Sequence, residues 1–346
     1  MTLLSLWAVS VVLSGVALLI MIGLILGRFV SQRRQDDLSQ QRKTLLPLLL
    51  GDAGDEVIHD ASVKRSPILR DLSIELIQLV RGEERQQLIA TATRLGVAES
   101  IRKVLAKGTT RARVVAAETL ADFPDEFTTD ALHRALEDRN DGVRLAAALA
   151  LASSDRAPPA QTLVQLLDLG MREQSMLIVA LFQEIARSSP AEIRSLIDDQ
   201  ISPPKVKAAA IEALSASGDY SLVPSIVQLA LKADPYGEEL PRYLRSLGAF
   251  QHPAGSPAIV QWLSAPTWWV RTAAAEAAGR IGLQETQSTL VDLLDDPDWW
   301  VRFRAGEALV RLGAEAQQLL AKVAATGSQR ASSAARLTLA EQAVQA

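Results

Sequence analysis

The amino-acid sequence predicts an all-α protein in which one N-terminal transmembrane helix precedes a right-handed α-α superhelix of stacked helical hairpins. Three observations support this prediction: an uncharged stretch of 25 residues near the N-terminus, a unit that recurs every 31 residues, and no alternating strand pattern. We expect a transmembrane anchor at 1–30, a juxtamembrane connector at 31–65, and a repeat region at 66–346 with about eight helical hairpins and a C-terminal cap.

The uncharged stretch runs from Leu3 to Gly27. As a helix it reaches about 37 Å, which is enough to cross a hydrocarbon core of roughly 30 Å with some tilt. A cleaved signal peptide is the alternative, but it requires basic residues before a shorter apolar run and small residues at a cleavage site. Neither feature is present, so we expect an uncleaved anchor.

The cations beside this stretch predict its orientation, because Lys and Arg near a span are retained on the cytoplasmic side. None precedes the span, whereas five follow it: Arg28, Arg33, Arg34, Arg42 and Lys43. We therefore expect a single-pass protein of the bacterial inner (cytoplasmic) membrane with its repeat region in the cytoplasm. Gly23 and Gly27 form a GxxxG pair, which favours close packing of two membrane helices. The sequence therefore allows two alternatives, a monomer and a homodimer formed through this helix.

Composition narrows the possible functions. The chain of 346 residues is 48% hydrophobic and 22% charged, so its body can bury a large core. A net charge of -4 offers no general attraction to phosphate backbones, and we expect no nucleic-acid partner.

The chain has no cysteine, and His59, His133 and His252 are far apart in sequence, so we expect no thiolate catalysis and no metal site. No Walker, Rossmann or nucleophile-elbow motif is present, and we expect neither a cofactor nor catalysis.

The repeat is clearest around Val270 and Val301, where two similar segments are separated by 31 residues. The same register recurs at Ala112, Val143 and Val206, and degenerate units are expected near Met176 and Glu238. We take the five residues Ala112, Val143, Val206, Val270 and Val301 as the reference position, offset 0, and count later residues of each unit from it. Small or apolar residues at offsets 0, 4 and 8 predict one buried helix stripe. Offset 4 holds Ala116, Ala147, Ala210, Ala274 and Ala305, and offset 8 holds Leu120, Leu151, Leu214, Ala278 and Leu309.

Residues that bound helices flank this stripe. Glycine at offset 12 ends a helix because it adopts the left-handed conformation readily, and Pro124 breaks another helix. The glycines are Gly218, Gly282 and Gly313. Three residues before the reference position lie side chains that can cap a helix N-terminus: Thr109, Asn140, Thr267 and Asp298. Each unit is therefore predicted to be a helix with defined ends.

The string Asp296-Pro297-Asp298 followed by Val301-Arg302, Ala305, Ala308-Leu309 and Gly313 resembles the HEAT repeat, in the short form also seen in phycobilisome-lyase-type repeat proteins. The resemblance covers about residues 66–340 and implies a HEAT/ARM-type solenoid. Such solenoids serve mainly as scaffolds and adaptors. The Trp-Trp-Val-Arg form also resembles bacterial membrane-anchored HEAT proteins that are associated with envelope polysaccharide glycosyltransferases.

Two tandem pairs of tryptophan are the strongest candidates for partner contact: Trp268 with Trp269, and Trp299 with Trp300. Tryptophan anchors many interfaces, and two such pairs would form an aromatic ridge. We expect Trp268 and Trp299 to pack as core against the preceding helix, whereas Trp269 and Trp300 are open to exposure and partner contact. The ridge could meet a protein groove, a sugar or the membrane surface.

A cation recurs at offset 1 of the units, in Arg113, Arg144, Lys207, Arg271 and Arg302. These side chains could bind an acidic partner along the superhelix. We favour the structural role that the resemblance to HEAT-like units implies, in which this cation pairs with an acidic residue of a neighbouring turn, such as Asp141 or Asp296. Arg271 and Arg302 nevertheless lie beside the Trp pairs and are kept as candidate partner-binding residues.

These observations favour a membrane-anchored scaffold that recruits or stabilises a protein partner through its repeat surface. An accessory subunit of an envelope polysaccharide synthase, with a membrane glycosyltransferase as partner, is the first alternative. A lyase of the phycobilisome-lyase type is the second, but the resemblance transfers no chromophore-handling residue to this chain.

Overall fold

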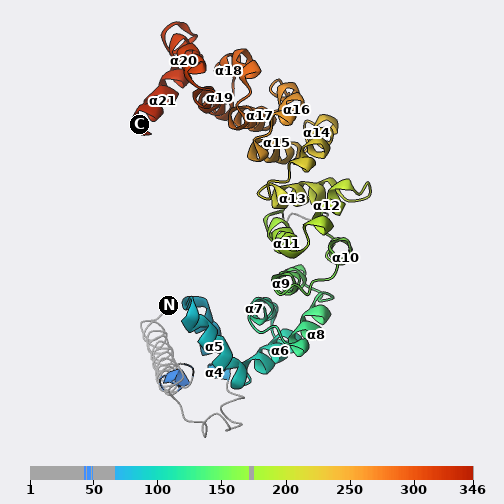
Figure 1. Cartoon of the computed structure of the whole chain (residues 1–346). Helices are drawn as coiled ribbons and strands as arrows, with labels where there is room; N and C mark the ends of the chain where they lie inside the picture. Colours follow the sequence, from blue (N-terminus) through green and yellow to red (C-terminus); the bar gives the residue numbers. More distant parts are fainter. Residues whose placement is uncertain (1–42, 44, 48, 50–66, 171–174, 346) are drawn as a thin grey trace, which may run out of the picture. The chain divides into compact units, whose positions relative to one another are not determined.

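The computed structural model describes residues 43, 45–47, 49, 67–170 and 175–345 (Figure 1). These residues form helices and connecting turns without a β-strand, so the all-α prediction is confirmed for them. None of their helices has the length and apolar character needed to cross a membrane. The predicted span at 3–27, with Gly23 and Gly27, and the predicted boundaries at 30 and 65 lie outside the described residues. The chain divides into two compact units, Met1–Ala135 and Leu136–Ala346.

From residue 67 on, the described part of the first unit consists of short helices connected by turns. Helix α6 packs on α4, α5, α7 and α8, and so lies at the centre of the unit. The bounds are α4 (Pro67–Leu79), α5 (Glu83–Arg94), α6 (Val97–Lys107), α7 (Thr110–Leu120) and α8 (Glu126–Ala135).

The second unit has two layers of helices (Figure 1). One layer is a series in which each helix packs on the next: α9 (Asp141–Ser153), α11 (Ser175–Ser188), α13 (Pro204–Leu214), α15 (Glu239–Phe250), α17 (Trp268–Ile281), α19 (Trp299–Arg311) and α21 (Gln329–Gln345). The other layer holds α10 (Ala160–Leu166), α12 (Pro190–Asp198), α14 (Val223–Lys232), α16 (Ser256–Trp262), α18 (Gln287–Leu293) and α20 (Ala314–Thr326). The short 3-10 turns η1 (Tyr220–Leu222), η2 (Pro253–Gly255) and η3 (Gln284–Thr286) precede α14, α16 and α18.

The predicted stripe forms the core between the layers. The residues at offsets 4 and 8 are all buried, with exposures between 0% and 4%. At the reference position Val143, Val206, Val270 and Val301 are fully buried, whereas Ala112 is half-buried. The buried stripe at offsets 4 and 8 is therefore confirmed.

The helix ends agree with the sequence at all but two positions: α13 ends at Leu214 with Ser215 as its cap, before Gly218, and Thr267 makes no cap. Gly218, Gly282 and Gly313 have positive φ angles of 73°, 84° and 97°. The side chains of Thr109, Asn140 and Asp298 each accept a hydrogen bond from a backbone N–H in the first turn of the following helix. The prediction for Thr267 was wrong: its hydroxyl donates instead to the Pro235 carbonyl, 2.9 Å away in the preceding hairpin, and so connects two repeats.

Further contacts that the sequence did not predict connect successive repeats in the second unit. The Trp262 indole donates to the Ala230 carbonyl at 2.9 Å, and Arg242 forms a bidentate ion pair with Glu212 at 2.7 and 2.9 Å. Tyr243 of α15 donates its phenol O–H to the Pro204 carbonyl of α13 at 3.2 Å, and burial raises the pKa of this phenol to about 12.

Glycines permit the closest helix contacts in this unit. A Cβ placed on Gly279 of α17 would lie 2.6 Å from the Cα of Ala308 in α19. A Cβ on Gly248 of α15 would lie 2.9 Å from the Cα of Ala277 in α17. The backbones of α15, α17 and α19 therefore touch where a larger residue would separate them.

Candidate functional site

The two tryptophan pairs lie at the first positions of α17 and α19, two neighbouring helices of one layer. Trp268 and Trp269 are 41% and 38% exposed, and Trp299 and Trp300 are 46% and 49% exposed. Each pair forms an edge-to-face contact, with ring centroids 5.8 and 4.7 Å apart. Trp299 also stacks on Phe303 at 5.1 Å and 13°.

The expectation that Trp268 and Trp299 belong to the core was wrong, and helix geometry explains why. Successive helical residues are rotated by about 100°, so a residue two positions before the reference valine points away from the stripe at offsets 0, 4 and 8. Trp299 therefore meets Phe303, four residues later on the same surface. The possible exposure of Trp269 and Trp300 is confirmed.

The four indole N–H groups make no hydrogen bond within the described part of the chain, in contrast to the buried Trp262. Each exposed indole thus offers an apolar surface and an unused donor, the combination that makes tryptophan common at interfaces.

Arg271 has the structural role that the sequence favoured. Its guanidinium forms a bidentate pair with Asp296 at 2.8 and 2.9 Å, where the two side chains are only 15% and 6% exposed. It also donates to the Ala265 and Pro266 carbonyls in the turn before α17. Asp296 lies in the turn before α19, so this arginine links two hairpins.

Arg302 repeats only part of this arrangement. Its Nη1 donates to the Asp296 and Pro297 carbonyls at 2.7 and 2.9 Å. Arg113 and Arg144 donate to the Gly108 and Asp138 carbonyls in the same way, and Arg144 also pairs with Asp141 at 2.8 Å. Tying the helix to its preceding turn is thus a shared property of these arginines.

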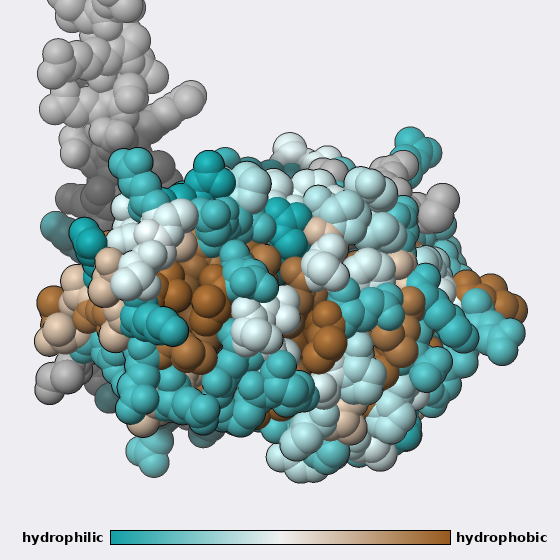
Figure 2. Space-filling view, turned by 90° about the horizontal axis from the view of Figure 1, so that it is seen from above, coloured by the Kyte–Doolittle hydropathy of each residue, from teal (hydrophilic) through white to brown (hydrophobic). Residues whose placement is uncertain are grey.

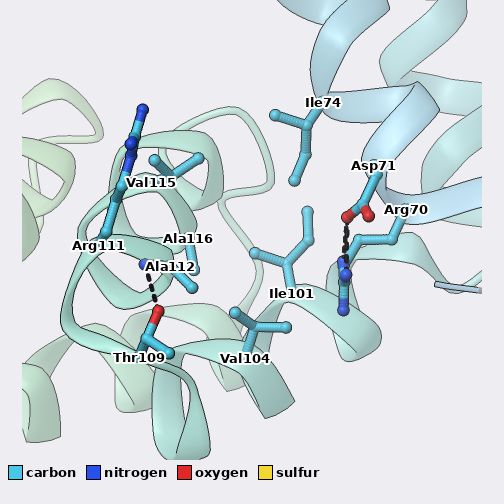
Figure 3. A pocket seen from close by; sticks show the side chains of 10 residues that line it. All are labelled: Arg70, Asp71, Ile74, Ile101, Val104, Thr109, Arg111, Ala112, Val115 and Ala116. Atoms are coloured by element: carbon cyan, nitrogen blue, oxygen red, sulfur yellow. Dashed lines mark hydrogen bonds and ion pairs between the residues drawn. The ribbon is translucent and has the colours of Figure 1, made fainter. Parts of the chain in front are cut away.

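A pocket of about 310 Å³ in the first unit lies among α4, α6 and α7 (Figure 3). Its wall is mainly aliphatic, with Ile74, Ile101, Val104 and Val115 facing the space. Arg70 and Asp71 at one side pair with each other at 2.7 Å. The sequence gave no indication of this pocket.

A second pocket, of about 210 Å³, lies between α19 and α21. Trp299, Phe303 and Leu337 provide apolar walls, and Arg302, Arg330 and Ser333 provide polar groups. Sequence reasoning identified Trp299 and Arg302 but missed the others, because α21 does not repeat the Trp-Trp-Val-Arg string.

In a space-filling view, hydrophobic residues gather in a band that hydrophilic residues border on both sides, an arrangement typical of contact surfaces (Figure 2). Within the described ranges, no group of three or more His, Asp or Glu residues could hold a metal ion.

Three proteins of known structure illustrate what the chain is similar to. The chain is similar to the karyopherin Kap121p bound to the extreme C-terminus of the protein phosphatase Cdc14p, with 14% identity, 87% of this chain and 39% of that chain covered, and a TM-score of 0.46. It is also similar to an engineered protein (18% identity, 86% and 88% covered, TM-score 0.38) and to human deoxyhypusine hydroxylase (17%, 71% and 99%, TM-score 0.31). The chain thus spans about two fifths of the Kap121p chain.

No curated protein sequence matches the chain. The family profile of HEAT repeats, in contrast, matches residues 98–173, 230–310 and 256–340, which together make up more than half of the sequence. The chain therefore belongs to the HEAT-repeat family and has an all-α, HEAT-type solenoid fold.

Proposed function

We propose that this protein is a membrane-anchored scaffold that recruits or stabilises a protein partner through the second unit of its HEAT-repeat region. The observation that carries this proposal is the pair of exposed tryptophan doublets at the start of α17 and α19, with four unused indole donors. Stacked helical repeats offer extended surfaces for recognition, and clustered tryptophan dominates many protein interfaces. The proposal assigns no catalytic step to the chain.

The membrane part of the proposal rests on the sequence. The uncharged stretch at 3–27 is long enough to span a bilayer, and the cations that follow it favour a cytoplasmic repeat region. A fluorescent protein fused after Ala346 should be bright, because it folds in the cytoplasm, and alkaline phosphatase at the same site should be inactive. The reverse pattern would contradict the orientation.

The binding part is tested with the double variant Trp269→Ala/Trp300→Ala. Partners are captured from detergent-solubilised membranes with the wild-type chain, identified by mass spectrometry, and quantified again with the variant. We expect recovery to fall at least tenfold, because tryptophan anchors at an interface contribute more than about 2 kcal/mol each. The helical circular dichroism should not change, since both side chains are exposed.

A matched control removes two exposed aromatics elsewhere, in Phe127→Ala/Tyr236→Ala; these side chains are 72% and 67% exposed. The control should recover the partner as the wild type does. Equal recovery by the tryptophan variant and the control would refute the assigned surface.

A further inference from the structure

The pocket between α19 and α21 combines an aromatic wall with two cations. Trp299 and Phe303 stack face to face on one side, and Leu337, which is 43% exposed, lies on the other. Arg302 and Arg330 line the same space. Apolar walls and guanidinium groups therefore meet in one small concave site.

The size of the pocket indicates its occupant. Pockets for drug-sized ligands have volumes of about 300–1,000 Å³. At about 210 Å³ this pocket is smaller, and it suits one large apolar side chain projecting from a polypeptide. A stacked aromatic wall is a favourable contact for such a side chain.

The charges at the pocket are not neutralised from within. No carboxylate lines it, and neither Arg302 nor Arg330 forms an ion pair within the described part of the chain. Each uses Nη1 for backbone carbonyls of the turn before α19: Arg302 donates to Asp296 and Pro297, and Arg330 to Asp295. Their remaining N–H groups are left for a ligand.

The carboxylates of that turn already have partners. Asp295 accepts from the Ser328 hydroxyl at 2.6 Å, and Asp296 accepts two bonds from Arg271. Asp298 accepts from the backbone N–H of Trp300 at 2.9 Å. Neither guanidinium is paired with one of these carboxylates in the described part of the chain, so both can bind an external carboxylate with strong, charge-assisted hydrogen bonds.

We propose that this pocket binds a peptide segment of the partner in which a large apolar side chain lies next to an Asp or Glu. The inference rests on the proposed scaffold function and specifies the chemistry of the partner. An internal acidic side chain fits better than a chain terminus, because terminal carboxylates are typically held by backbone N–H groups, whereas side chains supply the cations here.

The probe is a phage-displayed library of random dodecapeptides, selected on the full-length chain in lipid nanodiscs after depletion on empty nanodiscs. We expect the enriched peptides to carry Phe, Leu or Trp beside Asp or Glu. Their affinities are then measured by fluorescence anisotropy with synthetic, labelled copies.

Two variants change the pocket without removing a buried side chain. Arg330→Gln should weaken peptide binding at least threefold, because one guanidinium is lost. Leu337→Glu should weaken it at least tenfold, because a carboxylate then replaces an apolar wall and repels the acidic peptide. The matched control is Arg311→Gln, which removes an exposed charge of α19 that does not line the pocket and should change affinity less than twofold.

The inference fails if no peptide is enriched, if the enriched peptides are basic or uncharged, or if Arg330→Gln and Leu337→Glu bind them as the wild type does. Such a result leaves the scaffold function standing when Trp269→Ala/Trp300→Ala still loses its partner, because these two tryptophans do not line the pocket. Conversely, peptide binding with undiminished partner recovery in the tryptophan variant supports the pocket and refutes the tryptophan surface.

Discussion

Two regions of the molecule bury the same positions of the repeat but differ at their surfaces. One is the hairpin α6–α7 of the first unit, and the other comprises the hairpins ending in α17 and α19 of the second unit. In both regions the stripe is buried, with Leu120 and Leu309 at 0% exposure, and an arginine at offset 1 ties the helix to the preceding turn. The two positions before the reference residue hold Thr110 and Arg111 in α7 but tryptophan pairs in α17 and α19.

This difference shows where the repeat permits variation. Offsets 0, 4 and 8 are constrained by packing, whereas offsets −2 and −1 point away from the core and can be replaced without loss of the fold. In α7 these positions adjoin an aliphatic pocket that Arg111 lines, and in α19 they provide an aromatic wall. Recognition can therefore differ between regions built on one scaffold.

The largest expected effect concerns the buried Arg271–Asp296 ion pair of the second region. Arg271→Ala should lower the free energy of unfolding by about 3–5 kcal/mol, because it leaves the buried Asp296 carboxylate without its bidentate partner. Arg302→Ala removes only bonds to carbonyls and should have a smaller effect. Urea denaturation followed by circular dichroism measures both. Similar losses in the two variants would contradict the role assigned to Asp296.

The cores of the two regions are compared by shortening the same buried side chain, the leucine at offset 8, in each of them. Leu120→Ala and Leu309→Ala should each cost about 2–5 kcal/mol, because both side chains are fully buried at offset 8. Hydrogen exchange with mass spectrometry locates the loss of protection in α7 or α19, respectively. A large effect in one region with none in the other would show that the two cores are not equivalent.

The glycine contact provides the third test. Gly279→Ala should cost about 1–3 kcal/mol, because the added Cβ meets the backbone of Ala308. Gly282→Ala is the control for conformational strain: its φ is 84° and no atom lies within 4 Å of the added Cβ, so about 1 kcal/mol is expected. Thermal unfolding should rank the two variants in this order, and an inverted order would argue against the close packing of α17 on α19.

The smallest expected effect is the pH dependence of the stability that the Asp125 carboxylate contributes to the first unit. Burial alone would raise the pKa of Asp125, but hydrogen bonds from Thr128 and the charge of Arg102 hold it below its ordinary value of 3.8. Because the folded-state pKa is lowered, this carboxylate stabilises the fold above pH 3.8, and its contribution is lost as the pH falls below that value. Wild type and Asp125→Asn should therefore differ in urea midpoint at pH 7, and the difference should shrink as the pH falls below 3.8. A constant difference would contradict this account.

The sequence predicted the helical repeat well because its signals are local. The stripe, the helix ends at Gly282 and Gly313 and three of four caps depend on residues within one hairpin, and each is confirmed. The resemblance to HEAT-like units also implied that an arginine at offset 1 pairs with an acidic residue such as Asp296, and Arg271 does so.

The features below that the sequence predicted wrongly or did not predict are of two kinds. They depend on contacts between repeats, or on which way a side chain in the first turn of a helix points. Thr267 could cap its own helix, but the Pro235 carbonyl of the preceding hairpin competes for its hydroxyl. Trp268 and Trp299 were assigned to the core by hydrophobicity, although their rotation about the helix axis turns them outward. The sequence predicted neither the close helix contact at Gly279 nor the place of Leu337 in a pocket wall. Both depend on which residues of another helix face them.

The glycine contacts along α15, α17 and α19 also bear on how readily a partner can be held. Backbones in direct contact leave little room for one helix to slide or tilt against another, so the tryptophan pairs at the starts of α17 and α19 keep a constant spacing. A partner then meets a surface already set in its bound geometry, and less of the binding free energy is lost to ordering it.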